Sequence, residues 1–161
     1  MGDLYHRVMN YELFMGEALA EARLAAERGE QPNAAVAVVN DAMVARAHDR
    51  VRETNDPTAH AILVALREAA RRLGTAQLGD VTVFSTLEPC AMCVGALLAS
   101  DVTELVYAVP NRADGAAGTV LQLAQHPALA RRLQVVSGIR RGEAEELLER
   151  AIAAVPARSP G

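Results

Sequence analysis

The sequence predicts an α/β fold in which helices cover both faces of one mixed sheet. Segments with helical and strand patterns alternate, in the order helix, strand, strand, helix, strand, helix, strand, helix, strand, helix. The chain has 161 residues, 51% of them hydrophobic and 22% charged, which is typical of a soluble globular protein. We therefore expect a single domain over residues 1–161 with one core, spanning about residues 9–154.

The first part of the chain predicts a helix followed by a β-hairpin. Apolar side chains recur at helical spacing over residues 9–28, and Gly29 ends the run. Residues 34–39 and 42–47 have strand composition and are joined by the turn-forming pair Asn40–Asp41. These two strands are expected to be antiparallel neighbours.

The rest of the chain predicts strands joined through helices, and such strands are expected to run parallel. In order, the patterns indicate a polar loop over 54–58, a helix over 59–73 ended by Gly74, a strand over 81–87, a buried helix over 90–98, a strand over 103–109, short helical pieces over 121–129, a strand over 133–136, a helix over 143–154 and a frayed tail from Val155.

Charge and composition bear on partners and location. The net charge is −4, aromatic residues make up 3% and Trp is absent, so strong non-specific binding to nucleic acid is not expected. The arginines at 131, 132, 140 and 141 form either a local basic patch or an ordinary solvated surface. Neither a membrane-spanning segment nor an apolar signal core is evident, which predicts a cytoplasmic protein with no membrane partner.

Three residues indicate a metal site. His60 lies near the start of one expected helix, and Cys90 and Cys93 lie in the first turn of another. One imidazole nitrogen and two thiolates suit Zn²⁺, and cysteines three apart present their sulfurs on one helix face. Three protein ligands leave the fourth tetrahedral position open, as in catalytic sites. We expect one Zn²⁺ per chain; the alternative, a redox Cys-x-x-Cys pair, is typical of a thioredoxin-like layout.

A longer pattern surrounds these residues. The segments Asp56–Ala61, Ala65–Arg67, Thr86–Cys93 and Gly115–Gly118 resemble the bacterial tRNA adenosine deaminases of the cytidine and nucleoside deaminase superfamily, over residues 11–148. The resemblance implies a cytidine-deaminase-like three-layer α/β/α sandwich with a mixed five-stranded sheet, and a homodimer. It also implies that hydroxide formed at the zinc attacks an amidine carbon of a purine or pyrimidine.

The resemblance implies further site residues by position. It assigns the backbone N–H of Cys90, together with Ala61, to the catalytic site, and it assigns substrate contacts to Asn33, Asp49, Glu88 and Pro89. Asp49 stands where the family usually has an Asn that contacts the substrate. It either relays a proton through water or is an ordinary hydrogen-bonded loop residue.

Ile62 is the main departure from the family pattern. The family's proton-carrying Glu lies two residues after the His, and Ile62 occupies that position. Isoleucine cannot carry a proton, and loss of a general acid/base typically costs about 10²- to 10⁴-fold in rate. An apolar side chain there would also desolvate the position beside the metal.

Two functions follow from these observations. The first is a zinc-dependent hydrolase of the deaminase type that acts on a nucleoside, nucleobase or related heterocycle with an atypical or impaired proton path. The alternative is a catalytically inactive homologue, natural or altered, that binds zinc and a nucleobase or a partner subunit. A small nucleoside-like substrate is expected, and tRNA is disfavoured because stacking groups and phosphate-binding charge are sparse.

Overall fold

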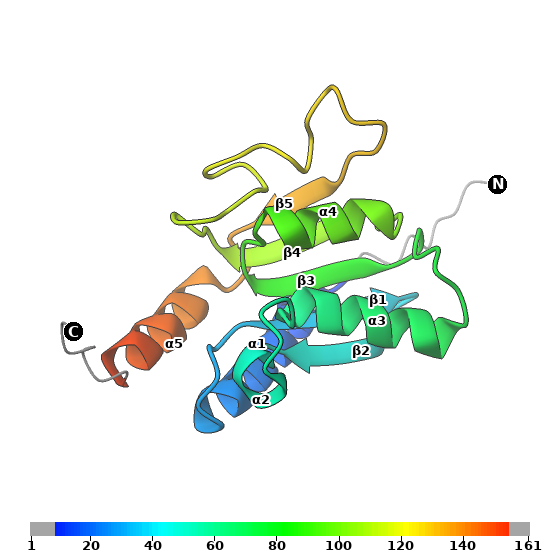
Figure 1. Cartoon of the computed structure of the whole chain (residues 1–161). Helices are drawn as coiled ribbons and strands as arrows, with labels where there is room; N and C mark the ends of the chain where they lie inside the picture. The colour runs from blue at the N-terminus through cyan, green and yellow to red at the C-terminus, as the bar shows by residue number, and fades with distance from the viewer. Residues whose placement is uncertain (1–8, 155–161) are drawn as a thin grey trace.

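The computed structural model describes residues 9–154 and contains one five-stranded sheet flanked by helices (Figure 1). The sheet order is β2-β1-β3-β4-β5. The elements are α1 (Tyr11–Glu27), β1 (Ala34–Val39), β2 (Ala42–His48), α2 (Val51–Thr54), α3 (Ala61–Leu73), β3 (Thr82–Leu87), α4 (Ala91–Ala99), β4 (Glu104–Val109), β5 (Gln134–Ser137) and α5 (Arg141–Ala154).

The strand directions match the sequence-based expectation. β1 is antiparallel to both β2 and β3, whereas β3, β4 and β5 are mutually parallel neighbours. The hairpin turn is confirmed, since Asn40 and Asp41 have φ values of 49° and 60°, as a two-residue turn of the favoured hairpin type requires. All strands except β1 therefore run in the same direction, and their carboxyl ends lie at one edge of the sheet.

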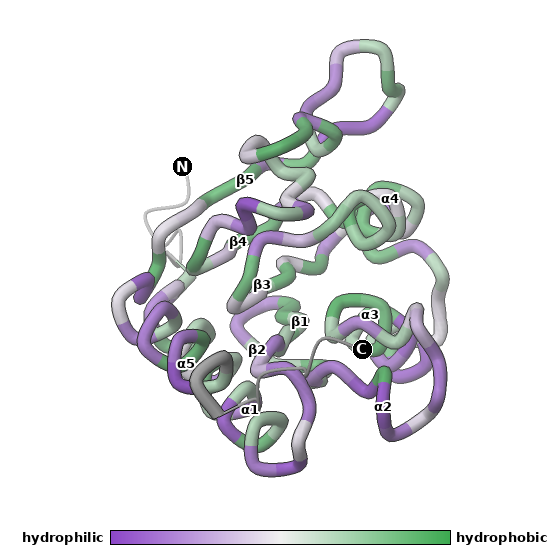
Figure 2. The backbone as a smooth tube through the Cα atoms, turned by 60° about the vertical axis from the view of Figure 1, so that its left-hand side comes forward, coloured by the Kyte–Doolittle hydropathy of each residue, from purple (hydrophilic) through white to green (hydrophobic). Residues whose placement is uncertain are grey.

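The helices form the two outer layers. α1 and α5 pack on one face of the sheet, and α3 and α4 pack on the other. Alternate strand residues supply the two cores, so that Val36 and Phe84 face α1 while Ala37 and Val83 face α3. Figure 2 shows the buried central strands and α4 largely in green and α5 largely in purple, consistent with a solvated outer face of α5. The predicted three-layer α/β/α fold is thus confirmed.

Small side chains let α3 approach the sheet closely. Ala61, Ala65 and Ala69 of α3 are at most 4% exposed and share a core cluster with Ala35 and Ala37 of β1. The opposite core contains three of the chain's few aromatic residues, with the ring centroids of Tyr11 and Phe14 lying 5.9 and 5.5 Å from that of Phe84. The alanine-rich layer is the one that carries the candidate site.

The segment between β4 and β5 contradicts one prediction. The expected helical pieces over 121–129 are absent, and this part of the described chain consists of turns and one isolated bridge between Ala117 and Gln122. The backbone amides here do not donate to the carbonyl four residues earlier, as they would in an α-helix. Instead, the Leu121 N–H donates to the Gly115 carbonyl and the Leu123 N–H donates to the Ala116 carbonyl. These hydrogen bonds fold the segment back onto residues 115–118.

The short helix α2 was not predicted, because the polar sequence before residue 58 indicates a loop. Its first amides are satisfied by a distant carboxylate, since Glu30 accepts from Arg52 N–H and Glu53 N–H at 3.4 and 2.8 Å. No helix within residues 9–154 is long and apolar enough to cross a membrane. The expected frayed tail from Val155 lies outside the described residues.

Candidate metal centre

The candidate site lies where two helices begin at the same edge of the sheet. β2 and β3 run in the same direction, α3 follows β2 after the short α2 segment, and α4 follows β3 directly. His60 is the N-cap residue of α3, and Cys90 is the N-cap residue of α4. Cys93 lies in the first turn of α4. The topology therefore brings together residues that are 30 or more positions apart in the chain.

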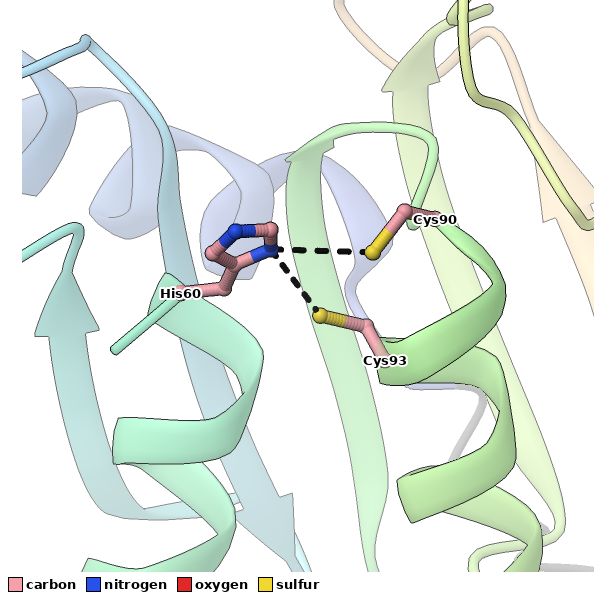
Figure 3. Close-up of side chains that lie close together, drawn as sticks. All are labelled: His60, Cys90 and Cys93. Carbon is pink, nitrogen blue, oxygen red and sulfur yellow. Dashed lines mark hydrogen bonds between the residues drawn. The ribbon is translucent and has the colours of Figure 1, made fainter. Parts of the chain in front are cut away.

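The three side chains converge on one point (Figure 3). His60 Nδ1 lies 3.6 Å from Cys90 Sγ and 3.5 Å from Cys93 Sγ. A tetrahedral zinc ion with Zn–N of about 2.1 Å and Zn–S of about 2.3 Å separates its N and S ligands by about 3.6 Å. The spacing therefore fits Zn²⁺. Among the described residues, no fourth His, Cys, Asp or Glu ligand atom joins this group.

The electrostatic surroundings of Cys90 and Cys93 also favour a bound cation. Neither Cys90 nor His60 makes a side-chain cap to its own helix, so the partly positive helix N-termini face the cluster. Burial raises the pKa of the Cys93 thiol well above its usual range, and the nearby Cys90 raises it further. A bound divalent cation would offset both effects by stabilising the thiolate.

Asp49 fixes the start of α3. Its Oδ1 accepts the Ala61 N–H at 2.8 Å, and its Oδ2 accepts a hydrogen bond from Asn33 Nδ2 at 3.1 Å. Burial raises the pKa of Asp49, and these two hydrogen bonds lower it in part. The prediction started this helix at residue 59; it begins at Ala61 because a residue twelve positions earlier caps it. Asp49 is therefore a hydrogen-bonded residue next to His60, and its role as a proton relay stays a prediction.

Glu88 holds the loop that follows β4. Its buried carboxylate accepts N–H groups from Asn111, Ala117 and Thr119 at 3.0 to 3.2 Å, and also the Thr119 hydroxyl. Gly115 is required beside it, because a Cβ there would clash with the Glu88 carboxylate and the Asn111 carbonyl. Glu88 was predicted from the family resemblance to contact substrate, and its oxygens are used here to fold the wall of the site.

One cavity of about 740 Å³ contains all the residues that the sequence singled out for the site. This volume is in the range of small-molecule sites and accommodates a nucleoside. The predicted residues that line it are Asn33, Asp49, His60, Ala61, Ile62, Glu88, Pro89, Cys90 and Cys93. The Ala61 amide is occupied by Asp49, whereas Ile62 is 3% exposed and also belongs to the core between α3 and the sheet.

The outer wall of the cavity was not predicted. It includes Arg112 from the loop after β4, and Arg141, Leu148 and Glu149 from α5. Helical periodicity identified α5 but gave no indication that its side chains reach a site built mainly from the centre of the chain. The one feature of the sequence that could have indicated this wall is that Arg141 belongs to the group of four arginines noted above.

The four arginines of that cluster do not form one patch. Arg131 pairs with Asp101 at 2.9 Å before β5, whereas Arg140 and Arg141 pair with Glu143 and Glu145 at the start of α5. The cluster is divided between the two ends of β5, and the charges of Arg131, Arg140 and Arg141 are locally paired. The solvated-surface interpretation therefore describes it better than a single basic patch.

Comparison with known proteins identifies the family. Residues 9–109 match the cytidine and deoxycytidylate deaminase zinc-binding region. The chain is 42% identical over 129 residues to the tRNA-specific adenosine deaminase of Bacillus subtilis, and the match covers 80% of each chain. The protein therefore belongs to the zinc-binding cytidine and deoxycytidylate deaminase family, with relatives among the tRNA-specific adenosine deaminases.

Solved structures agree with this assignment. A structure from studies of A-to-I editing by tRNA:A34 deaminases superposes with a TM-score of 0.82 at 37% identity, covering 84% of this chain and 99% of that chain. Guanine deaminase from Nitrosomonas europaea gives a TM-score of 0.77 at 27% identity, covering 91% and 87%.

These relatives count against the expectation that tRNA is a disfavoured partner. That expectation came from the loss of stacking groups and phosphate-binding charge in segments where the sequence departs from the family pattern. Departures of this kind are therefore not enough to disfavour tRNA as a partner.

Zinc content provides a direct check on the three proposed ligands. We expect the purified protein to contain about one zinc per chain, and His60→Ala or Cys93→Ser to lose most of it, because two ligands hold Zn²⁺ far more weakly than three. His126→Ala, at an exposed histidine outside the group, is the matched control and retains the metal. Elemental analysis after dialysis measures the difference, and full zinc content in both ligand variants would contradict the assignment.

Glu88→Gln is expected to lower the free energy of unfolding by about 2 kcal/mol or more. In the wild-type protein, buried backbone N–H groups donate to the Glu88 carboxylate, and in the variant an amide N–H₂ group would face some of these donors. Glu146→Gln removes a carboxylate from an exposed pair with Arg150 and should change stability by no more than about 0.5 kcal/mol. Denaturant unfolding of both variants gives the comparison. Equal losses would show that the Glu88 hydrogen bonds contribute little.

Proposed function

We propose that the protein binds one Zn²⁺ through His60, Cys90 and Cys93 and hydrolytically deaminates a nucleobase, with slow proton transfer because of Ile62. The observation that carries the proposal is the tetrahedral spacing of one imidazole nitrogen and two sulfurs within a nucleoside-sized cavity. Zinc, when bound, supplies a Lewis acid that activates water for attack on the amidine carbon of the base.

The chain's own groups explain why this chemistry would be impaired. Deamination needs a group that takes a proton from water and delivers it to the ring nitrogen and the departing ammonia. Ile62 has no titratable group, and its side chain is packed into the core. Two buried carboxylates, those of Asp49 and Glu88, do line the cavity, but each has both oxygens engaged in hydrogen bonds. Neither is positioned as a ready substitute.

The substrate is proposed to be a purine or pyrimidine base, either free or presented by tRNA. A cavity of about 740 Å³ with α5 side chains on one wall favours a single extruded base or a small nucleoside over a duplex. The relationship to tRNA-specific adenosine deaminases and the structural likeness to a guanine deaminase support both forms. The proposal includes a homodimer, and exposed apolar side chains at Met92, Val120 and Leu121 offer surface that a second copy would cover.

A second candidate function is a binding protein of the same fold that does not turn over its ligand. The burial of Ile62 favours it, because an apolar residue integrated in the core is consistent with a site remodelled for binding. The two functions share the metal and the cavity, and they differ in whether restoring a proton carrier produces catalysis.

The variant Ile62→Glu distinguishes the deaminase function from the binding function. We expect it to raise ammonia release from adenosine, guanine, cytidine or an anticodon stem-loop RNA by about 10²-fold or more, because it supplies a general acid/base beside the metal. Ile62→Gln has a similar size and polarity but cannot carry the proton, and it serves as the control at matched zinc content. If Ile62→Glu retains zinc yet releases no more ammonia than Ile62→Gln on any substrate, the deaminase proposal fails and the binding function remains.

A further inference from the structure

A second cavity lies beside the edge strand β2, outside the metal centre. Its volume is about 630 Å³, and it is lined by residues of α1, β2, α2 and α3 and of the segment between α2 and α3. These elements lie close together at the β2 edge of the sheet (Figure 1). A cavity of this size holds a small ligand or a short stretch of a larger one.

The lining of this second cavity is positively charged. The chain has no lysine, and six of its 16 basic residues line this one cavity. Four carboxylates line it too, so that with His48 neutral the lining carries two more positive than negative charges, in a chain whose net charge is −4. We call this cavity the arginine hollow, after Arg28, Arg46, Arg50, Arg67, Arg71 and Arg72. Its charge favours an anionic ligand.

The unpaired charges of the arginine hollow are both positive. The four carboxylates each already have a hydrogen-bond or ion-pair partner: Glu21 has Arg46, Glu53 has Arg50, Asp56 has Thr58, and Glu68 has Arg71 and Arg72. By contrast, Arg28 and Arg67 are exposed, and neither side chain makes a hydrogen bond or an ion pair with any of residues 9–154. Each of these two guanidinium groups has five N–H donors to offer a ligand.

The arginine hollow and the metal cavity lie on the two sides of one chain segment. Neighbouring residues of this segment line different cavities, since Arg50 and Ala59 line the hollow whereas Asp49 and His60 line the metal cavity. A ligand long enough to cross this single stretch of backbone can therefore occupy both cavities.

We propose that the arginine hollow binds the phosphate backbone of an RNA strand whose base occupies the metal cavity. The inference rests on the proposed function and deepens it, because it selects a base presented by RNA over a free base, which has no phosphate to place in the hollow. Guanidinium groups suit this ligand, since their N–H donors bind phosphate oxygens in pairs. Contacts of this kind position the strand and leave the choice of base to the metal cavity.

An ordinary solvated surface would carry the same arginines without a binding role. Any two exposed arginines would then contribute equally to RNA binding through their charge, wherever on the protein they lie. Dependence of the affinity on position therefore distinguishes a phosphate-binding hollow from a general electrostatic effect.

The test is binding of a fluorescein-labelled anticodon stem-loop RNA to the zinc-loaded protein, followed by fluorescence anisotropy at several salt concentrations. We expect the double variant Arg28→Gln/Arg67→Gln to bind about tenfold more weakly than the wild type. The slope of log K against log salt concentration should be smaller by roughly 1 to 2, because two phosphate contacts are lost. Both side chains are exposed and unbonded within the described chain, so the fold should tolerate their replacement.

A matched double variant controls for the loss of charge. Arg131→Gln/Arg132→Gln removes the same charge from exposed residues that line neither cavity, and it should change the RNA affinity by about twofold or less. Equal losses in the two double variants, or no loss in Arg28→Gln/Arg67→Gln, would overturn the inference.

Neutral methylphosphonate linkages in the anticodon identify the group that the arginines contact. We expect wild-type protein to bind this RNA about as weakly as Arg28→Gln/Arg67→Gln binds the unmodified RNA. Combining the two changes should cause little further loss, because both remove the same contacts. Losses that add in full would show that the two arginines act on something other than these phosphates, and would overturn the inference.

Calorimetric binding of adenosine and guanosine reports on the metal cavity separately. We expect nucleoside affinity to be the same in the wild type and in Arg28→Gln/Arg67→Gln, because neither arginine lines that cavity. If a nucleoside binds but RNA affinity does not depend on Arg28 and Arg67, the inference is wrong and the proposed function stands. If the wild type binds neither nucleoside nor RNA, the proposed function fails with it.

Discussion

Two buried carboxylates, those of Asp49 and Glu88, hold the backbone beside the candidate metal residues. Asp49 binds the first amide of α3, next to His60, and Glu88 gathers the loop after β4 beside Cys90. Both helices begin at the same sheet edge because β2 and β3 run in the same direction. His60 and Cys90 are the N-cap residues of these two helices and make no side-chain hydrogen bond to their own helix.

The same arrangement makes Ile62 consequential. It lies two residues into α3 from His60, so any side chain at this position is held beside the metal cluster whether or not it can act chemically. The isoleucine packs in the core between α3 and the sheet and has no titratable group. Under the proposed function, the chain therefore has the fold and the candidate metal residues of its family but lacks a proton carrier at this position.

The sequence predicted most of the fold because local signals agreed with the tertiary structure. Glycines 29 and 74 end their helices with φ of +76° and +66°, and the Asn40–Asp41 turn sets the hairpin. The metal residues were recognised from spacing and residue type alone. Contacts between distant segments could not be predicted in this way, and these include the Asp49 cap, the Glu30 cap of α2, the folded loop at 121–129 and the α5 wall of the cavity. Asn33 and Asp49 were each predicted to contact substrate, but not to contact each other.

In the proposed metal site, one imidazole and two thiolates are the protein ligands, and a fourth position is left to solvent or substrate. X-ray absorption at the zinc edge of the metal-loaded protein tests it most directly. We expect two sulfur scatterers at about 2.3 Å and two lighter atoms at about 2.0–2.1 Å, one of them an imidazole nitrogen. A shell of four sulfurs, shared between chains, or a shell without sulfur would contradict it.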